Sequence, residues 1–440
     1  MCPVCEDLIN NDVAAPIIDT YEGRASSSNG YPFHNWYNFV LGYTPTFPEY
    51  MINRENITSE DCVLDPFVGS GTTQLVCKLR TIPSFGIDAN DFMVFAAKQK
   101  LNWKVNPKTL SRHLKKINDA YKVVVSEIDW TDGEELSRRA NDNRPSALDN
   151  RYISDKPLVK VESLRAAINQ VKMANNYKDL FMFAVSAILV PVSNVKYGPG
   201  FGIGKIKDDA DVIGIFNNKV EEMIRDLASV NEEQRNTETT TLLGDSRQLS
   251  KYIDPNSISL IITSPPYPGD HEYTKHSKLE LIFNGFAYDL SSFRVIKKRM
   301  IRGSTTNIYK EDNEKALIDD IQEIKDVTDE IDNRLIHDGA TSGFEKLYTR
   351  LIWEYFGGMA STLQESFKVL KPGGKIALLV SDSHAFKMVH IKTAELLQRV
   401  GLKLGYVNPE IVLWQMKNST SHKYQLRENI LILQKPEERG

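Results

Sequence analysis

Short apolar runs alternate with mixed, helix-like segments near the start of this chain. The runs at residues 62–64 and 84–88 predict two buried strands, and the segments at residues 73–78 and 91–100 predict helices. A glycine-containing turn separates the first strand from the first helix, and the second strand ends in Asp88. This order is that of a βαβ unit, so we expect a parallel sheet.

The same alternation resumes in the second half of the chain. The motif Lys371-Pro372-Gly373-Gly374 is a strong stop signal for the helix before it. The expected elements are a βα pattern at 241–246, strands at 259–262 and 375–380, helices at 359–370 and 391–400, and an antiparallel pair at 407–413 and 429–434. The chain therefore predicts an α/β fold whose mostly parallel sheet ends in an antiparallel strand pair.

A long polar segment, residues 105–238, interrupts this pattern; it favours helices and shows no strand alternation. Its glycine cluster at residues 197–205 predicts either a mobile loop or a plain surface turn. Residues 1–30 are polar and rich in serine and asparagine, so we expect them to be irregular. We infer an α/β catalytic domain made of residues 31–104 and 239–440, with residues 105–238 as a helical insert.

Composition narrows the classes of protein to consider. The 440 residues are 41% hydrophobic and 25% charged, which is ordinary for a globular protein. The formal net charge of −4 excludes a globally basic nucleic-acid binder. Local basic patches must therefore carry any contact with phosphates.

The cysteines and the apolar stretches indicate a reduced, cytoplasmic chain. Cys2 and Cys5 have the spacing of a zinc knuckle or a redox pair, but no second close pair exists, and Cys62 and Cys77 flank an expected strand and helix. We expect incidental thiols, no disulfide framework and no metal. The N-terminus lacks the features of a signal peptide. The longest apolar stretch, residues 180–192, is shorter than the about twenty residues that span a bilayer, so we expect no membrane contact.

The turn after the first strand contains the most informative glycine motif, Asp65-Pro66-Phe67-Val68-Gly69-Ser70-Gly71-Thr72-Thr73. Glycines let the backbone approach a ligand, and the N-terminus of the next helix offers free N–H groups. Gln74 stands where the nicotinamide fingerprint needs a third glycine, and no lysine completes a P-loop. Asp88 either accepts hydrogen bonds from a ribose diol or begins the next helix. A nucleoside-bearing ligand fits this motif.

The segment after the strand at 259–262 is Ser264-Pro265-Pro266-Tyr267. An exocyclic amino nitrogen is a poor nucleophile because its lone pair delocalises into the ring. Acceptors on its hydrogens, such as the Ser264 hydroxyl and the Pro265 carbonyl, make it more pyramidal, and two prolines hold them in place. Tyr267 can stack on a base that has left the duplex. The motif therefore suits the activation of a base amino group, without an enzyme nucleophile.

Together these motifs resemble the two signature motifs of the S-adenosylmethionine-dependent DNA amino-methyltransferases. The resemblance covers about residues 31–100 and 241–435. It implies a Rossmann-like methyltransferase fold, S-adenosylmethionine as the cofactor and double-stranded DNA as the substrate. The implied catalytic residues are Ser264, Pro265, Pro266 and Tyr267, and the implied cofactor-binding residues are Asp65, Pro66, Phe67, Gly69, Gly71, Thr72, Thr73, Asp88 and Asp245.

The first residue of the catalytic motif bears on the target base. Families that act on adenine N6 mostly carry Asp or Asn before Pro-Pro, whereas those that act on cytosine N4 mostly carry Ser. Ser264 therefore favours cytosine N4, with adenine N6, or an RNA or protein substrate of the same fold, as alternatives. Such enzymes usually act in restriction-modification or phage defence, so the resemblance implies a cognate restriction endonuclease as a possible partner. It also makes residues 105–238 a candidate target-recognition domain.

A basic cluster follows the catalytic motif and is a candidate for contacts with DNA: Arg294, Lys297, Lys298, Arg299 and Arg302. It leads into residues 303–307, which add hydroxyl and amide groups, and such mixtures suit phosphates. The alternative is a solvated charged face. A second basic cluster at residues 108–116 lies on an expected helix, where the solvated face is the favoured interpretation.

Overall fold

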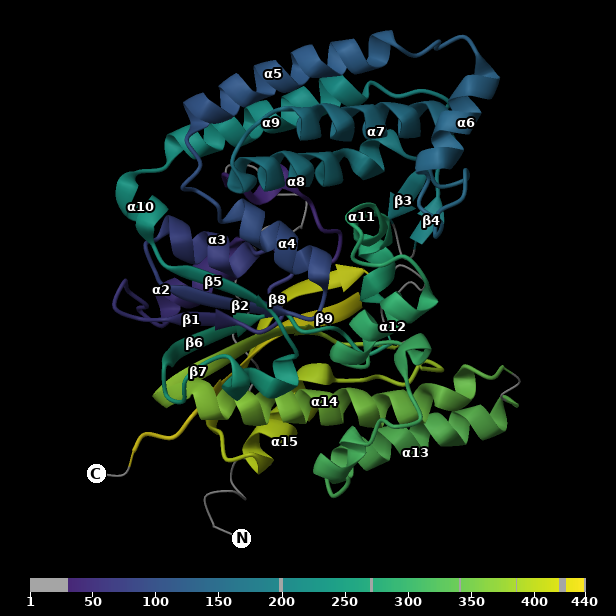
Figure 1. The fold of residues 1–440 in the computed structure, drawn as a ribbon. Helices are drawn as coiled ribbons and strands as arrows, with labels where there is room; N and C mark the ends of the chain where they lie inside the picture. The colour runs from purple at the N-terminus through teal and green to yellow at the C-terminus, as the bar shows by residue number, and fades with distance from the viewer. Residues whose placement is uncertain are drawn as a thin grey trace.

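The computed structural model describes residues 31–197, 201–269, 272–339, 342–384, 386–418 and 425–438. Within these ranges the centre is a seven-stranded sheet with the order β5-β2-β1-β6-β7-β9-β8 (Figure 1). Its strands are β1 (Val63–Asp65), β2 (Ser84–Asp88), β5 (Thr239–Leu243), β6 (Ile258–Thr263), β7 (Leu370–Ser381), β8 (Val407–Asn418) and β9 (Gln425–Gln434). The first five strands in this order pair in parallel, whereas β9 is antiparallel to both of its neighbours. The expected fold class is confirmed.

Helices cover both faces of the sheet, which explains why its central strands are continuously apolar. Leu260 and Ile262 of β6 pack on the side of α2 (Thr46–Arg54) and α3 (Thr72–Leu79). Ile261, which points the other way, packs on the side of α14 (Tyr348–Val369) and α15 (Thr393–Lys403). Figure 1 shows these two helical layers above and below the strands.

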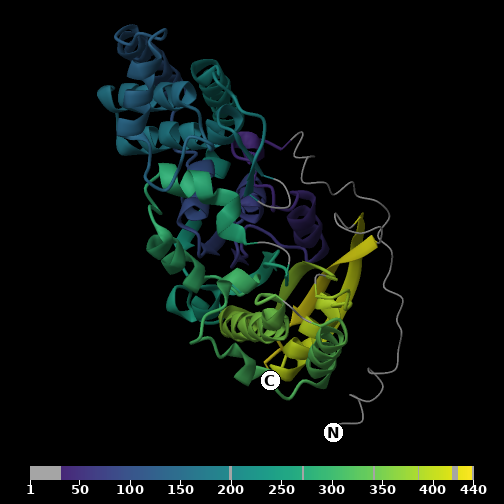
Figure 2. The same ribbon diagram turned by 90° about the vertical axis from the view of Figure 1, so that its right-hand side faces the viewer.

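Residues 105–238 form a helical layer beyond α4 (Asp91–Lys100), seen at the top of Figures 1 and 2. The helices are α5 (Pro107–Ser126), α6 (Gly133–Asn143), α7 (Asp155–Gln170), α8 (Asn175–Val192), α9 (Val212–Ser229) and α10 (Glu232–Asn236). An antiparallel strand pair, β3 (Val195–Tyr197) and β4 (Phe201–Ile203), overlaps the expected glycine cluster at residues 197 and 201–203. The expectation of no strands here was wrong, because these strands are only three residues long and show no alternating pattern. The insert shares one hydrophobic core with Phe92 and Met93 of α4.

The chain between β6 and β7 wraps around the carboxyl edge of the sheet. Its elements are η3 (Tyr273–Ser277), α11 (Lys278–Phe283), α12 (Leu290–Arg299), η4 (Thr305–Asn307), η5 (Glu314–Leu317), α13 (Gln322–His337) and η6 (Glu345–Leu347). Helix α14 begins at Tyr348, earlier than the expected residue 359, because Leu351, Ile352 and Phe356 extend its buried face. The remaining short elements are η1 (His34–Trp36) and η2 (Ser246–Lys251).

The expectations for the N-terminal segment and for part of the glycine cluster concern residues outside the described ranges. Residues 1–30, with Cys2 and Cys5, lie outside them, as do residues 198–200 of the glycine cluster. Cys62 and Cys77 are free thiols, and burial raises the pKa of both. Every helix in the described ranges is too short or too polar to cross a bilayer.

Candidate active site

Asp65, the last residue of β1, joins three segments of the chain. Its side chain is buried and accepts hydrogen bonds from the Thr263 hydroxyl and the Tyr43 hydroxyl, each at 2.6 Å, and from the Phe67 N–H at 3.1 Å. Burial raises the pKa of Asp65 above its ordinary value, against the effect of these hydrogen bonds. Asp65 therefore fixes the glycine loop to the end of β6 and to the segment before α2.

The glycine loop passes close to the sheet and ends at the start of α3. Gly71 has a φ of 92°, in the left-handed region, and a Cβ there would lie 3.3 Å from the Ala97 Cβ. Helix α3 starts at Thr72, and its N-cap residue Gly71 has no side chain that could cap the first N–H groups. These backbone donors suit a ligand at the helix N-terminus.

Asp88, the last residue of β2, holds the glycine loop from the neighbouring strand. Its carboxylate accepts hydrogen bonds from the N–H groups of Gly69 and Asn90, each at 2.8 Å. Burial raises the pKa of the Asp88 carboxyl to about 6, although these two N–H groups act in the opposite direction. Asn90, and not Asp88, caps α4 through its side chain. The alternative role of Asp88 as a helix cap is therefore wrong.

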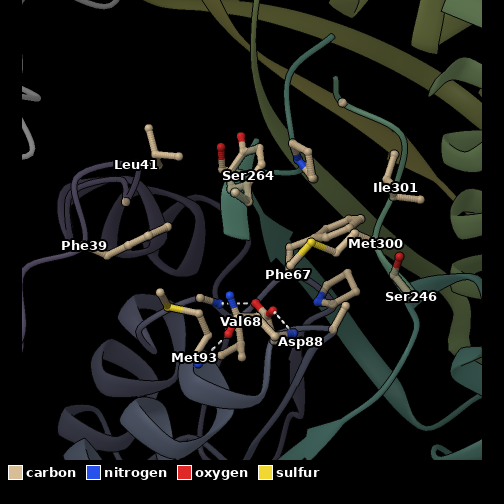
Figure 3. Close-up of a pocket in the computed structure, with 18 of the residues that line it drawn as sticks. Phe39, Leu41, Phe67, Val68, Asp88, Met93, Ser246, Ser264, Met300 and Ile301 are labelled. Atoms are coloured by element: carbon tan, nitrogen blue, oxygen red, sulfur yellow. Dashed lines mark hydrogen bonds between the residues drawn. The ribbon is translucent and has the colours of Figure 1, made fainter. Parts of the chain in front are cut away.

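A cavity of about 970 Å³, counted with the solvent at its mouth, lies where β1, β2 and β6 end. Figure 3 shows Asp88 and Met93 near the glycine loop, with Ser264 across the cavity from them. Its walls include Phe39, Leu41, Gly42, Tyr43, Pro66, Phe67, Val68, Gly69, Ser70, Thr72, Asp88, Ala89, Asn90, Met93, Ser246, Ser264, Pro266, Glu272 and Tyr273.

The Ser-Pro-Pro-Tyr segment forms the wall opposite the glycine loop. The Ser264 hydroxyl donates to the Leu379 carbonyl oxygen at 3.0 Å and lies 3.2 Å from the Tyr267 hydroxyl oxygen. Tyr267 donates in turn to the Glu428 carboxylate at 3.1 Å. Ser264 and Pro266 line the cavity, whereas Pro265 and Tyr267 stand behind them. The structure thus brings both sequence motifs to one cavity.

Four of the expected cofactor-binding residues do not line the cavity. Asp65, Gly71 and Thr73 do not line the cavity. Asp245 caps η2 and binds the Arg247 guanidinium, with distances of 2.9 and 2.7 Å to its two oxygens. Its neighbour Ser246 lines the cavity instead. The expected contact of Asp245 with a ligand has no support in this geometry, because Arg247 takes up its carboxylate.

The basic cluster after the catalytic motif is divided between several environments. Lys297 pairs with Glu272 and Arg299 pairs with Asp91, and both cations line the cavity. Arg302 is buried and pairs with Asp312 at 2.8 Å, so the expectation that it meets DNA was wrong. Only Arg294 and Lys298 of this cluster are exposed, 5.1 and 5.5 Å from the centre of the Tyr309 ring.

The segment after α12 closes one side of the cavity, whereas the sequence had indicated only its residues 303–307, and those as candidates for phosphate contacts. Met300, Ile301, Gly303, Ser304 and Asn307 line this side. The Gly269 N–H donates to the Gly303 carbonyl at 3.0 Å, which ties the segment to the loop after β6. No local motif marks these residues, since their position depends on contacts made across the fold. Within the described ranges, no His, Cys, Asp or Glu side chains gather into a group that would hold a metal ion.

Comparisons with known proteins found DNA methylases to which this chain is similar. A family model described as DNA methylase matches residues 28–99. The Type II methyltransferase M.BsoBI of Geobacillus stearothermophilus is 24% identical over 92% of this chain and 86% of its own length. The Type II methyltransferase M.AvaI of Nostoc sp. is 21% identical over 92% of this chain and 87% of its own length. A solved structure described as a DNA modification methylase from Thermus thermophilus aligns with a TM-score of 0.21 and 15% identity, over 45% of this chain and 53% of that one.

Proposed function

We propose that this chain is an amino-methyltransferase of the DNA methylase family and that it methylates N4 of cytosine at a specific site in double-stranded DNA. The observation that carries the proposal is the single cavity shared by Ser264 and the glycine loop. The base preference rests on the serine at the first position of the catalytic motif. Adenine N6 is the alternative target, because the chemistry of the two amino groups is the same.

The family depends on S-adenosylmethionine, and the residues of the cavity fit that cofactor. Asp88 offers carboxylate oxygens to a ribose diol, and Thr72, the first residue of α3, lines the same cavity. Val68, Met93 and Ile301 add apolar surface suited to a flat adenine ring. When bound, S-adenosylmethionine supplies an electrophilic methyl group on its sulfonium.

The Ser-Pro-Pro-Tyr segment prepares the amino group for transfer. The Ser264 hydroxyl oxygen and the Pro265 carbonyl oxygen accept hydrogen bonds from the amino hydrogens, so that the nitrogen lone pair localises. Pro265 and Pro266 fix the positions of these acceptors before the base arrives. Tyr267 stands behind this wall of the cavity, and it is the proposed aromatic residue for stacking on the base after the base has left the duplex. The nitrogen then loses one proton once its new bond to carbon has formed.

DNA contact is proposed for the exposed face of α12 and for the insert. Arg294 and Lys298 lie one helical turn apart on α12, and Leu290, one turn before them, is 89% exposed. The strand pair β3–β4 packs on α11, since the Lys278 ammonium lies 5.2 Å from the Phe201 ring. Figure 1 shows β3–β4, α11 and α12 on the same side of the molecule. We therefore propose that residues 105–238 take part in target recognition.

The names of the relatives favour a role in restriction-modification, with a cognate endonuclease that cuts the same site. In that role the chain protects host DNA by marking it.

Replacing Ser264 tests the proposed reaction. Ser264→Ala is expected to lower kcat by about a hundredfold, as for the loss of one preorganised hydrogen-bonding group, and to leave S-adenosylmethionine binding unchanged. Mass spectrometry of nucleosides from treated DNA measures both the rate and the product. The matched control is Ser59→Ala, at an exposed serine in the turn before β1 and outside residues 105–238.

The nature of the product decides between the alternatives. N4-methylcytosine that depends on Ser264 supports the proposal, whereas N6-methyladenine would transfer the same mechanism to the other base. A folded wild-type enzyme that binds S-adenosylmethionine and methylates no DNA would overturn the proposed function.

A further inference from the structure

Glu428 is a buried acid that no motif predicted, and it lies beside the catalytic segment. It is in β9, opposite Ser381 of β7 and Gln415 of β8, and only 2% of the residue is exposed. Ser264 is hydrogen-bonded to the same part of β7, through Leu379. A charged carboxylate is costly at such a place unless it is fully hydrogen-bonded.

Three side chains satisfy the Glu428 carboxylate. One oxygen accepts hydrogen bonds from the Tyr267 hydroxyl at 3.1 Å and from the Lys417 ammonium, and the other accepts from the Gln415 amide. The register of β8 shifts between Leu413 and Gln415. Such irregularities re-aim side chains, and here Gln415 and Lys417 both reach the face of the sheet on which Glu428 lies.

The hydroxyl protons around Glu428 can be assigned from these contacts. A carboxylate only accepts, so the single Tyr267 proton is donated to Glu428, and burial together with the Glu428 charge raises the pKa of Tyr267 well above its ordinary value. The Ser264 proton is donated to the Leu379 carbonyl. Neither hydrogen then lies between Ser264 and the cavity.

We propose that Glu428 is a positioning residue for methyl transfer: it accepts the hydrogen bond that the Tyr267 hydroxyl donates, so that the lone pairs of Ser264 stay free for the amino group of the base. This inference rests on the proposed function. Without Glu428, the nearest acceptor for the Tyr267 proton is the Ser264 oxygen, 3.2 Å away. A hydrogen bond from Tyr267 would occupy the oxygen that has to accept the amino group.

A double-mutant cycle between Glu428 and Tyr267 tests the inference. Glu428→Ala is expected to lower kcat about tenfold, the rate equivalent of one hydrogen bond, with little change in KM for DNA. Tyr267→Phe keeps the aromatic ring but has no hydroxyl that could donate a hydrogen bond to Ser264. In the Tyr267→Phe background, Glu428→Ala should therefore change kcat by less than about twofold.

A merely structural role for Glu428 predicts a different result. If Glu428 only holds the strand pair, its loss should be equal in both backgrounds, and that outcome would overturn the inference. Glu428→Gln provides a second variant that keeps an oxygen for the Tyr267 proton and should recover most of the rate. Failure of Glu428→Gln to recover any rate, in a protein that melts like the wild type, would also count against the inference.

A control variant separates effects on the strand pair from effects on the site. Asn408→Ala removes the Asn408–Gln434 hydrogen bond at the far end of β8 and β9, and it should leave methylation unchanged. A wild-type enzyme that methylates no DNA would overturn the proposed function together with this inference. Normal wild-type methylation with equal losses in both backgrounds would overturn this inference alone.

Discussion

At the scale of single residues, the acids around the cavity accept hydrogen bonds from other groups of the protein. Asp65 accepts hydrogen bonds from two hydroxyl groups and one backbone N–H, and Asp88 accepts them from two backbone N–H groups. Glu428 accepts a hydrogen bond from the Tyr267 hydroxyl. These bonds hold the glycine loop and the catalytic segment in place before any ligand enters. Of the three, Asp88 alone also lines the cavity, so it is the one whose charge a ligand can sense directly.

If Asp88 binds S-adenosylmethionine as proposed, we expect that binding to depend on pH. Burial raises the pKa of this carboxyl to about 6, so that it gains a proton as the pH falls through that value. A protonated carboxyl has fewer lone pairs for a ribose diol, and its two backbone bonds already occupy acceptor positions. Affinity should therefore be greatest above pH 7 and should fall towards pH 5. Calorimetric titration across this range measures the effect.

The matched variant for this prediction is Asp88→Asn, which has no carboxyl to titrate. It should bind the cofactor more weakly than the wild type at pH 8 and should show a flat pH profile. A wild-type affinity that is constant from pH 5 to pH 8 would rule out Asp88 as the contact to the diol.

At the scale of elements, Glu280 connects three parts of the fold that are distant in sequence. This residue of α11 is buried, and it accepts hydrogen bonds from Tyr37, beside η1, at 3.1 Å and from Tyr197, on β3, at 2.7 Å. Burial raises the pKa of Glu280 to about 7, although the two tyrosine hydrogen bonds act against this rise. The insert is thus attached to the catalytic domain through an acid that titrates near neutral pH.

Stability should depend on pH through Glu280. Because its pKa is raised in the folded state, the folded protein binds the extra proton more tightly than the unfolded chain does. The stabilisation is therefore complete below about pH 4.5 and is lost as the pH rises through about 7. Glu280→Gln removes this titration and keeps an oxygen for a tyrosine, so it should raise the Tm at pH 8 by about 3 °C relative to its effect at pH 5. Thermal melts at both pH values measure this difference, and an equal effect at the two values would contradict it.

The elements that the sequence predicted well are those whose ends are marked by local residues. Strand β2 and helix α4 were expected at their observed bounds, because an acid ends the strand and Asn90 begins the helix. The meeting of Ser264 with the glycine loop also follows from local patterns, since carboxyl ends of parallel strands share one edge. In contrast, the burial of Arg302 depends on Asp312, and Glu428 reaches the site only through the register of β8 and β9. Such positions are set by tertiary contacts that no local pattern contains.

At the scale of the whole molecule, charge limits how the protein can hold DNA. The chain has 54 Lys and Arg against 58 Asp and Glu, which gives the formal net charge of −4. Lys297, Arg299 and Arg302 of the cluster after the catalytic motif are paired with acids. General attraction to phosphates is therefore weak, and a few exposed cations near the cavity should carry most of it.

The salt dependence of DNA binding tests this view of the whole surface. Each phosphate contact adds about one unit to the slope of log Kobs against log salt, so replacing Arg294 and Lys298 by alanine should reduce the slope by up to about two units. The matched control replaces Lys392 and Lys403, which are exposed at the two ends of α15, outside residues 105–238, and change the net charge equally. Fluorescence anisotropy with a duplex at several salt concentrations measures both slopes. Equal reductions in the two variants would mean that net charge, and not the face of α12, determines the electrostatic contribution, because both pairs would then act only through the overall field.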